Sequence, residues 1–175
     1  MTKSILLAGF GGQGILFSGK FLAYKGLIEG NEVSWLPSYG PEMRGGTCNC
    51  SVILSDRQIG SPIVTNPDIL IAMNLPSLDK FENAVVPGGQ IFVDSTLIER
   101  KVNRDDVDVF YIPATRLASE NGFQTLANMV MIGHLLSKGD FTRDNIDTAM
   151  GKIVSAKRQN LLDSNIAAVE LGYNY

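Results

Sequence analysis

The stretch Gly9-Phe10-Gly11-Gly12-Gln13-Gly14 (residues 9–14) decides the fold class of this chain. An apolar run at 5–8 precedes it directly, and a short apolar run that ends in glycines is typical of a buried parallel strand. Apolar side chains then recur at helical spacing from residue 15 to residue 29. A strand, a glycine turn and a helix in this order predict a Rossmann-like opening to an α/β fold.

The rest of the chain alternates between strand-like and helix-like segments. Further strands are predicted at 33–36, 47–54, 69–73, 90–94 and 109–112, the second of these beside the first. Helices are predicted at 77–84, 114–120, 126–136, 142–150 and 155–171. Ser77 is expected to cap the first of these helices, and Asp140 or Thr142 the fourth. No linker or repeat divides the sequence, so we predict one α/β domain over residues 1–175, with a mostly parallel sheet flanked by helices.

The bulk composition excludes several classes of partner. The chain is 45% hydrophobic and 19% charged, which is typical of a globular protein. Its net charge of −3 and its pI near 5.1 give no reason to expect binding to nucleic acid or to an anionic membrane. No run approaches the roughly 18 apolar residues that span a bilayer, and the first residues lack the pattern of a signal peptide. We therefore expect a cytoplasmic protein.

The potential metal ligands are few. Cys48 and Cys50 alternate along a predicted strand, and we expect them to be free, buried thiols on the same face. Two sulfurs cannot hold an iron–sulfur cluster, and the single histidine, His134, does not complete a zinc site. His134 lies in an apolar helical segment and is interpreted as a core residue. Any redox centre for a reaction of this protein must therefore come from another chain.

The glycine turn has the form of a phosphate-binding loop. The main-chain N–H groups at a helix start attract anions, and the candidates here are Gly11, Gly12, Gln13 and Gly14. NAD binding also requires an acidic residue at the end of the second strand. The strand at 33–36 instead runs into Pro37, and Glu32 lies at its start. NAD or FAD is disfavoured; another phosphate ligand, a docked partner or simply a tight turn remain as alternatives.

A second unusual loop, residues 37–47, reads Pro-Ser-Tyr-Gly-Pro-Glu-Met-Arg-Gly-Gly-Thr. Arg44 can pair with a phosphate or a carboxylate, while Glu42 can simply neutralise Arg44 in an ordinary surface loop. If the first two strands are neighbours, this loop and the glycine turn face one crevice at the carboxyl edge of the sheet. The residues predicted at this crevice or partner surface are Tyr39, Glu42, Met43 and Asn74.

Taken together, these motifs resemble the gamma subunit of 2-oxoacid:ferredoxin oxidoreductases. The similarity covers about residues 4–136 and includes the glycine turn, the loop at 37–47, and the segments Asn-Pro-Asp-Ile-Leu-Ile-Ala-Met-Asn-Leu-Pro-Ser and Val-Pro-Gly-Gly-Gln-Ile-Phe-Val-Asp-Ser. The intact loop at 37–47 is most similar to the 2-oxoglutarate-type and branched-chain-type enzymes, whereas pyruvate-type members vary it.

The resemblance implies a division of labour among subunits. Thiamine diphosphate would be held by the alpha and beta subunits and iron–sulfur clusters by the beta and delta subunits, with ferredoxin as electron acceptor and coenzyme A as acyl acceptor. The gamma chain would bind no cofactor alone, would be inactive alone, and is expected to self-associate when isolated. Its glycine turn (Gly11, Gly12, Gln13, Gly14) and Arg44 would contact coenzyme A or another phosphate.

Two other functions stay open at this point. A stand-alone module that binds a nucleotide or phosphate without redox activity would use the same glycine turn. A small NAD-linked dehydrogenase is disfavoured by the missing acidic residue after the second strand.

Overall fold

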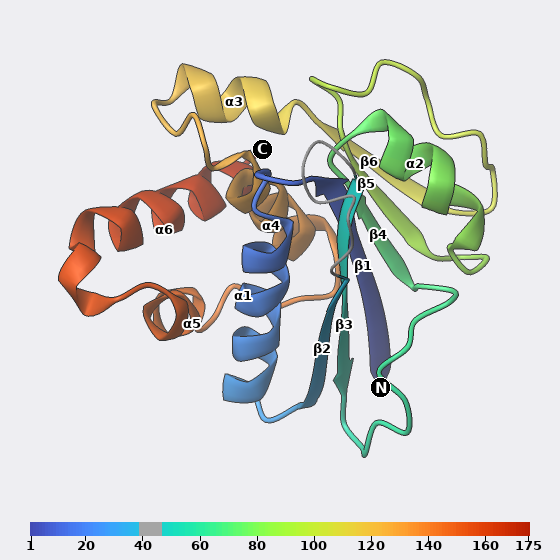
Figure 1. Ribbon diagram of the computed structural model, residues 1–175, viewed down its shortest axis with the longest axis horizontal. Helices are drawn as coiled ribbons and strands as arrows, with labels where there is room; N and C mark the ends of the chain where they lie inside the picture. The colour runs from blue at the N-terminus through green and yellow to red at the C-terminus, as the bar shows by residue number, and fades with distance from the viewer. Residues whose placement is uncertain (39–46) are drawn as a thin grey trace.

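The sheet is built around β1 (Thr2–Phe10), which crosses the centre of the molecule (Figure 1). The structure, a computed structural model, describes residues 1–38 and 47–175. The other strands are β2 (Glu32–Ser38), β3 (Thr47–Ser55), β4 (Ile69–Ala72), β5 (Gln90–Asp94) and β6 (Asp108–Ile112). They form one six-stranded sheet in the order β2-β3-β1-β4-β5-β6.

All strands except β3 run in the same direction. β1 pairs in parallel with β4, β4 with β5 and β5 with β6, whereas β3 is antiparallel to both β1 and β2. The predicted mostly parallel α/β sheet is confirmed. The condition that the first two strands are neighbours is not met, because β3 lies between β2 and β1. β3 then pairs with β1 along its whole length, from Thr2 opposite Ser55 to Phe10 opposite Thr47.

Helices cover both faces of the sheet (Figure 1). They are α1 (Ile15–Ile28), α2 (Leu75–Phe81), α3 (Ala114–Glu120), α4 (Ala127–Lys138), α5 (Ile146–Ile153) and α6 (Gln159–Tyr173), with short 3-10 helices at η2 (Glu82–Ala84) and η3 (Ala156–Arg158). Ile5 and Leu7 of β1 pack into the core with α1 and α4, while Leu6 packs with α2 on the opposite face. Side chains alternate between faces along a strand, so this apolar run is buried on both sides. Among the described helices, none combines the length and apolarity that crossing a membrane would require.

Two helix starts differ from the predicted ones. The side-chain oxygen of Asn74 accepts a hydrogen bond of 2.9 Å from the main-chain N–H of Ser77, so Asn74 caps α2 and Ser77 lies inside the helix. α5 begins at Ile146, after Asn145 in the left-handed region (φ 63°). Thr142 is not a cap: its hydroxyl donates to Glu29 over 2.7 Å. At α2 the cap is another local residue, three positions before Ser77, whereas Thr142 is held by a tertiary contact with Glu29.

Helices α4 and α6 approach closely through two glycines. A Cβ atom at Gly133 would lie 1.9 Å from the main-chain oxygen of Val169, and one at Gly172 would lie 1.8 Å from that of Val130. The main chains of the two helices are therefore in close contact, with no room for a side chain at either glycine.

Candidate functional site

The connections that leave β1 and β4 diverge at the carboxyl edge of the sheet. β1 leads into α1 on one face, and the neighbouring strand β4 leads into α2 on the other. In open α/β sheets, ligands bind in the crevice at such a switch point. The glycine turn and Asn74 follow these two strands directly. The topology therefore brings together two of the features predicted from the sequence.

The glycine turn presents an uncapped helix start. Gly12 and Gly14 have φ values of 92° and 74°, which L side chains rarely adopt. Gly14 is the N-cap of α1, with no side-chain cap and no acidic residue in the first turn. Among the described residues, nothing accepts a hydrogen bond from the N–H groups of Gly11, Gly12 or Gly14. These groups, with the positive end of the α1 dipole, are suited to an anion.

Gln13 has a different role from its glycine neighbours. Its side-chain oxygen accepts from the N–H of Phe10 over 2.6 Å, and its side-chain nitrogen donates to the main-chain oxygen of Met73 over 3.1 Å. Its own N–H donates to the oxygen of Phe10 over 3.2 Å. Gln13 therefore ties the glycine turn to the end of β4, and its hydrogen-bonding groups are already engaged with the main chain.

A hollow of about 230 Å³ opens beside the turn. It lies where the first turns of α1 and α4 meet the ends of β4 and β5, and neither helix has a side-chain cap or an acidic residue in its first turn. Among the described residues, the lining side chains include no charged group: Gly12, Gln13, Met73, Leu97, Thr115, Gln124, Thr125 and Ala127. Three of the four polar side chains in this lining follow residue 90: Thr115 in α3, and Gln124 and Thr125 in the loop before α4. The sequence pattern alone gave no indication of a site there.

Asp94 organises the far wall of this hollow. It is fully buried at the end of β5, where its carboxylate accepts from the hydroxyl of Thr115 over 2.6 Å and from the N–H of Thr96 over 3.0 Å. These bonds fix the start of α3 and the turn that carries Leu97. No sequence motif points to Asp94, although an acidic residue at the end of an apolar strand is a signal that could have marked it.

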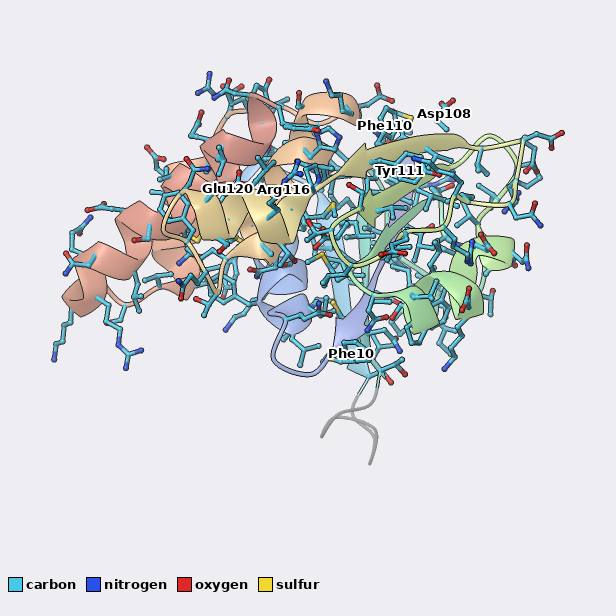
Figure 2. All side chains as sticks on the ribbon, turned by 90° about the horizontal axis from the view of Figure 1, so that it is seen from above. Phe10, Asp108, Phe110, Tyr111, Arg116 and Glu120 are labelled. Atoms are coloured by element: carbon cyan, nitrogen blue, oxygen red, sulfur yellow. The ribbon has the colours of Figure 1, made fainter. Side chains whose placement is uncertain are left out.

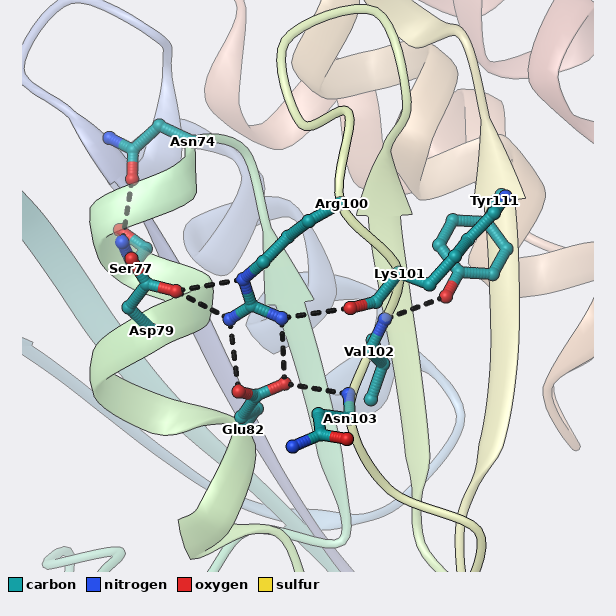
Figure 3. Close-up of polar contacts among 9 residues, drawn as sticks. All are labelled: Asn74, Ser77, Asp79, Glu82, Arg100, Lys101, Val102, Asn103 and Tyr111. Atoms are coloured by element: carbon teal, nitrogen blue, oxygen red, sulfur yellow. Dashed lines mark hydrogen bonds and ion pairs between the residues drawn. The ribbon is translucent and has the colours of Figure 1, made fainter.

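Asn74 lies on the α2 side of the same edge. Its oxygen caps α2, but its side-chain nitrogen is buried and has no hydrogen-bond partner within residues 1–38 and 47–175, and the same holds for the hydroxyl of Ser77. Figure 3 shows how the Arg100 guanidinium, beside α2, bonds to the carboxylates of Asp79 in α2 and Glu82 in η2. These two carboxylates raise the pKa of Arg100 above its ordinary value, so the bridge stays charged.

The remaining predicted site residues, Tyr39, Glu42, Met43 and Arg44, lie outside the described residues. The strands on either side of them are described, and Ser38 pairs with Asn49 while Thr47 pairs with Phe10. β1 and β2 are both antiparallel to β3, so they end at the same edge of the sheet although β3 separates them. Ser38 and Thr47, the described residues on either side, therefore lie at the edge of the sheet that carries the glycine turn.

β2 does not end in the acidic residue that an NAD site requires, as the sequence indicated. Glu32 is the first residue of β2 and pairs with Ser55, at the opposite edge of the sheet from the glycine turn. Glu32 therefore could not reach the ribose of a dinucleotide bound at the glycine turn.

The cysteines and the histidine are core residues, as predicted. Cys48 and Cys50 are free and buried against α1, and burial raises the pKa of the Cys50 thiol to about 12. His134 is buried against Phe92 and Phe110, and this burial lowers its pKa to about 4. A protonated thiol is a poor nucleophile and metal ligand, and His134 is enclosed by aromatic side chains in the core.

The chain is similar to known proteins over almost its whole length. Residues 4–175 match the family described as pyruvate ferredoxin/flavodoxin oxidoreductase. The chain is 39% identical over 170 residues to ketoisovalerate oxidoreductase subunit VorA of Methanothermobacter thermautotrophicus, which covers 96% of this chain and 35% of that one. It is 35% identical over 177 residues to 2-oxoglutarate synthase subunit KorC of Methanocaldococcus jannaschii, which covers 99% of this chain and 93% of that one.

A solved structure shares the fold. It is 2-oxoglutarate:ferredoxin oxidoreductase from Magnetococcus marinus with 2-oxoglutarate, coenzyme A and succinyl-CoA bound. The TM-score is 0.89 at 23% identity, over 99% of this chain and 30% of that one. The chain thus spans about a third of the length of this protein and of VorA, but nearly all of KorC.

Proposed function

The chain belongs to the pyruvate ferredoxin/flavodoxin oxidoreductase family, and from this premise we propose that it is the gamma subunit of a thiamine-diphosphate-dependent 2-oxoacid:ferredoxin oxidoreductase. The complex would convert a 2-oxo acid and coenzyme A into acyl-CoA and CO₂, and would pass the electrons to ferredoxin. The alpha, beta and delta subunits are its proposed partners. The observation that carries this proposal is the family match over residues 4–175, together with the uncapped glycine turn at the switch point.

The residues of this chain do not fit an iron–sulfur cluster. Among the described residues, no group of three or more His, Cys, Asp or Glu side chains is placed to hold a metal ion. The two cysteines are buried, and a thiol with a pKa near 12 does not supply the thiolate that a cluster requires. The clusters are therefore assigned to the partner subunits, and thiamine diphosphate is assigned to them on the family resemblance alone.

We assign part of the coenzyme A surface to the carboxyl edge of this chain. The free N–H groups of Gly11, Gly12 and Gly14 can donate to a phosphate oxygen, and Arg44 adds a positive charge from the loop at 37–47. Gln13 acts here by fixing the turn rather than by touching the ligand. A hollow of about 230 Å³ is too small for the whole of coenzyme A. The rest of the molecule would lie against a partner subunit.

The proposed 2-oxo acid is 2-oxoglutarate. The KorC relative is named for 2-oxoglutarate and the VorA relative for ketoisovalerate. Further relatives named 2-oxoglutarate synthase subunit KorC, 40% and 41% identical over 142 residues, support this choice.

Purification of the tagged chain from its own cells, without oxygen, tests the proposal. Viologen reduction that depends on both 2-oxoglutarate and coenzyme A is expected from the purified complex, and ketoisovalerate and pyruvate serve as comparison substrates. A protein that elutes alone and is inactive with every 2-oxo acid would contradict the proposal and favour a stand-alone phosphate-binding module.

Two glycine variants test the coenzyme A surface within the active complex. Gly12 and Gly30 both have positive φ and open space where a Cβ would lie, but Gly30 follows α1 at the opposite edge of the sheet. Gly12→Ala and Gly30→Ala therefore carry similar backbone strain. An increase of about tenfold or more in KM for coenzyme A is expected for Gly12→Ala only. Equal effects of the two variants would place the coenzyme A surface elsewhere.

A further inference from the structure

The two outermost strands of the sheet are protected to different degrees. Among the described residues, β2 and β6 each pair with a single neighbouring strand. β2 contains Pro37, which has no N–H group, and residues 58–60 share a hollow with its first half. β6 contains no proline or lysine, and Figure 2 shows it as the outer strand of the sheet, with Asp108 at its start. Proteins usually protect an exposed edge with such residues, so β6 is the open edge of this sheet.

The main-chain groups of β6 point alternately toward β5 and away from it. The N–H of Asp108 donates to the oxygen of Gly89 over 2.9 Å, so alternate residues from Asp108 onward face β5 in the parallel pair. The N–H and C=O groups of Val109 and Tyr111 therefore point outward. In the described part of the chain, neither N–H has a hydrogen-bond partner. β6 thus offers two donors and two acceptors to another strand.

The side chains of β6 are apolar on both faces of the sheet. Phe110 stacks on Phe92 of β5, with ring centroids 4.8 Å apart, on the face that α4 covers. Val109 and Tyr111 pack on the opposite face, which α2 covers. Phe110, Val109 and Tyr111 are all only half-buried, and Asp108 is the one charged residue of the strand. An apolar edge with free main-chain groups is the kind of surface to which a further strand binds.

The sequence of β6 is suited to pairing with a second copy of itself. In an antiparallel pair centred on Phe110, Val109 of each copy lies opposite Tyr111 of the other. The outward groups of Val109 and Tyr111 would then exchange four hydrogen bonds across the junction. The two Phe110 residues would form the non-hydrogen-bonded pair, in which side chains approach most closely. Aromatic–aromatic and aromatic–β-branched pairs are among the cross-strand pairs that stabilise antiparallel strands.

The charge of Asp108 favours this antiparallel arrangement over a parallel one. In the antiparallel pair, Asp108 of one copy lies opposite Ile112 of the other, so the two carboxylates are at opposite ends of the paired strands. The end marked by Ile112 leads into α3, which carries the exposed Arg116 (Figure 2). In a parallel pair the two carboxylates would lie side by side and repel each other. Charge thus selects a two-fold antiparallel pair, the symmetry that two identical copies provide.

We propose that β6 is a self-association surface, through which two copies of this chain join their sheets edge to edge about a two-fold axis. The two six-stranded sheets would become continuous. Pro113, directly after β6, has no N–H and ends the pairing. The contact is therefore short, and we expect a dimer that dissociates on dilution. The proposal does not rest on the proposed function, because it uses neither the glycine turn nor the hollow beside it.

Two substitutions at Val109 test the pairing in the full chain. Val109→Pro removes an outward N–H and leaves the hydrogen bonds to β5 in place, whereas Val109→Ala shortens the side chain and keeps the N–H. Sedimentation equilibrium at chain concentrations from about 5 to about 500 µM measures the dissociation constant of the dimer. Because the two-fold axis makes each substitution act twice, an increase of about tenfold or more is expected for Val109→Pro. Val109→Ala should raise the constant less than about threefold.

Hydrogen exchange in the wild-type chain gives a second test that needs no variant. Mass spectrometry compares the exchange of peptides that cover β6 and β2 at chain concentrations of about 20 µM and about 1 mM. The β6 peptide should exchange about threefold or more slowly at the higher concentration, because the N–H groups of Val109 and Tyr111 are then bonded to the second copy. The β2 peptide is the control and should exchange at the same rate at both concentrations.

The other outcomes would each overturn the proposal. Circular dichroism first shows whether each variant is folded, and if Val109→Pro is not, the exchange measurement decides alone. A wild-type chain that stays monomeric over the whole range would exclude the dimer. A dimer that Val109→Pro leaves unchanged, or β6 exchange that does not depend on concentration, would place the contact on another surface. Equal weakening by Val109→Pro and Val109→Ala would assign the contact to side chains rather than to strand pairing. None of these results bears on 2-oxo acid activity, which tests the proposed function separately.

Discussion

The side-chain nitrogen of Gln13 donates to the main-chain oxygen of Met73 over 3.1 Å, and this bond connects the glycine turn after β1 to the end of β4. The same side chain accepts from Phe10 over 2.6 Å. The side-chain amide of Gln13 thus connects the ends of β1 and β4, the two strands at the switch point of the sheet. A Cβ at Gly9 would lie 2.6 Å from the oxygen of this amide, which shows how tightly the turn closes around it.

Gln13→Ala should destabilise the fold by about 1–3 kcal/mol, because it leaves the Phe10 N–H and the Met73 oxygen without their partner. Urea unfolding measures this loss. Gln124→Ala, on the rim of the same hollow, is the control and should cost less than about 0.5 kcal/mol. Unchanged stability with a loss of coenzyme A affinity would mean that Gln13 contacts the ligand instead.

The close approach of α4 and α6 predicts opposite effects of the same substitution at different glycines. Gly133→Ala and Gly172→Ala should each cost about 3 kcal/mol or more, because a Cβ there would overlap main-chain atoms of the other helix. Gly151 lies in α5 with open space around it, so Gly151→Ala should stabilise the protein by about 0.5–1 kcal/mol. Thermal unfolding of the three variants tests this, and a similar Tm for all three would contradict the packing.

The buried His134 predicts a fall in stability at mildly acidic pH. Burial, with Lys138 nearby, lowers its pKa from 6.5 to about 4, so below pH 6.5 the unfolded chain binds a proton that the folded chain does not. The free energy of unfolding should therefore decrease as the pH falls from 6.5 to about 4, by up to roughly 3 kcal/mol. Denaturant unfolding across this range measures the change.

His134→Phe provides the control for this pH effect. Phenylalanine can pack against Phe92, Phe110 and Tyr175 as the imidazole does, but it does not titrate. The chain has only one histidine, so the part of the slope between pH 6.5 and 5 that is due to His134 should disappear. An unchanged slope in that range would assign it to other groups.

Two arginines should differ in their contribution to stability. Arg100 forms ion pairs with Asp79 in α2 and with Glu82 in η2, and Glu82 is almost buried. Arg100→Ala should cost about 1–3 kcal/mol, because a nearly buried carboxylate loses its partner. Arg116 and Glu120 on α3 form an exposed pair (Figure 2), so Arg116→Ala should cost less than about 0.5 kcal/mol. Equal losses of stability for the two variants in urea unfolding would show that the ion pairs of Arg100 contribute no more than an exposed ion pair does.

The sequence indicated the sheet and α1 because their signals are local. A continuous apolar run before Gly9-Phe10-Gly11-Gly12 gives β1, and the helical spacing after Gly14 gives α1. The helix caps were less predictable. Thr142 had the right chemistry for a cap but bonds to Glu29, 113 residues away, and no local pattern contains that contact.

By itself, the sequence determined the α/β class, the glycine turn, the missing acidic residue of an NAD site and the core roles of Cys48, Cys50 and His134. These follow from the order, spacing and chemistry of neighbouring residues. Only the tertiary structure decided that β3 lies between β1 and β2, that Gln13 is bound to Met73, and that Leu97, Thr115 and Ala127 meet at one hollow. Strand order and the packing of distant loops depend on which surfaces bury each other, and this is settled by the free energy of the whole fold rather than by any one segment.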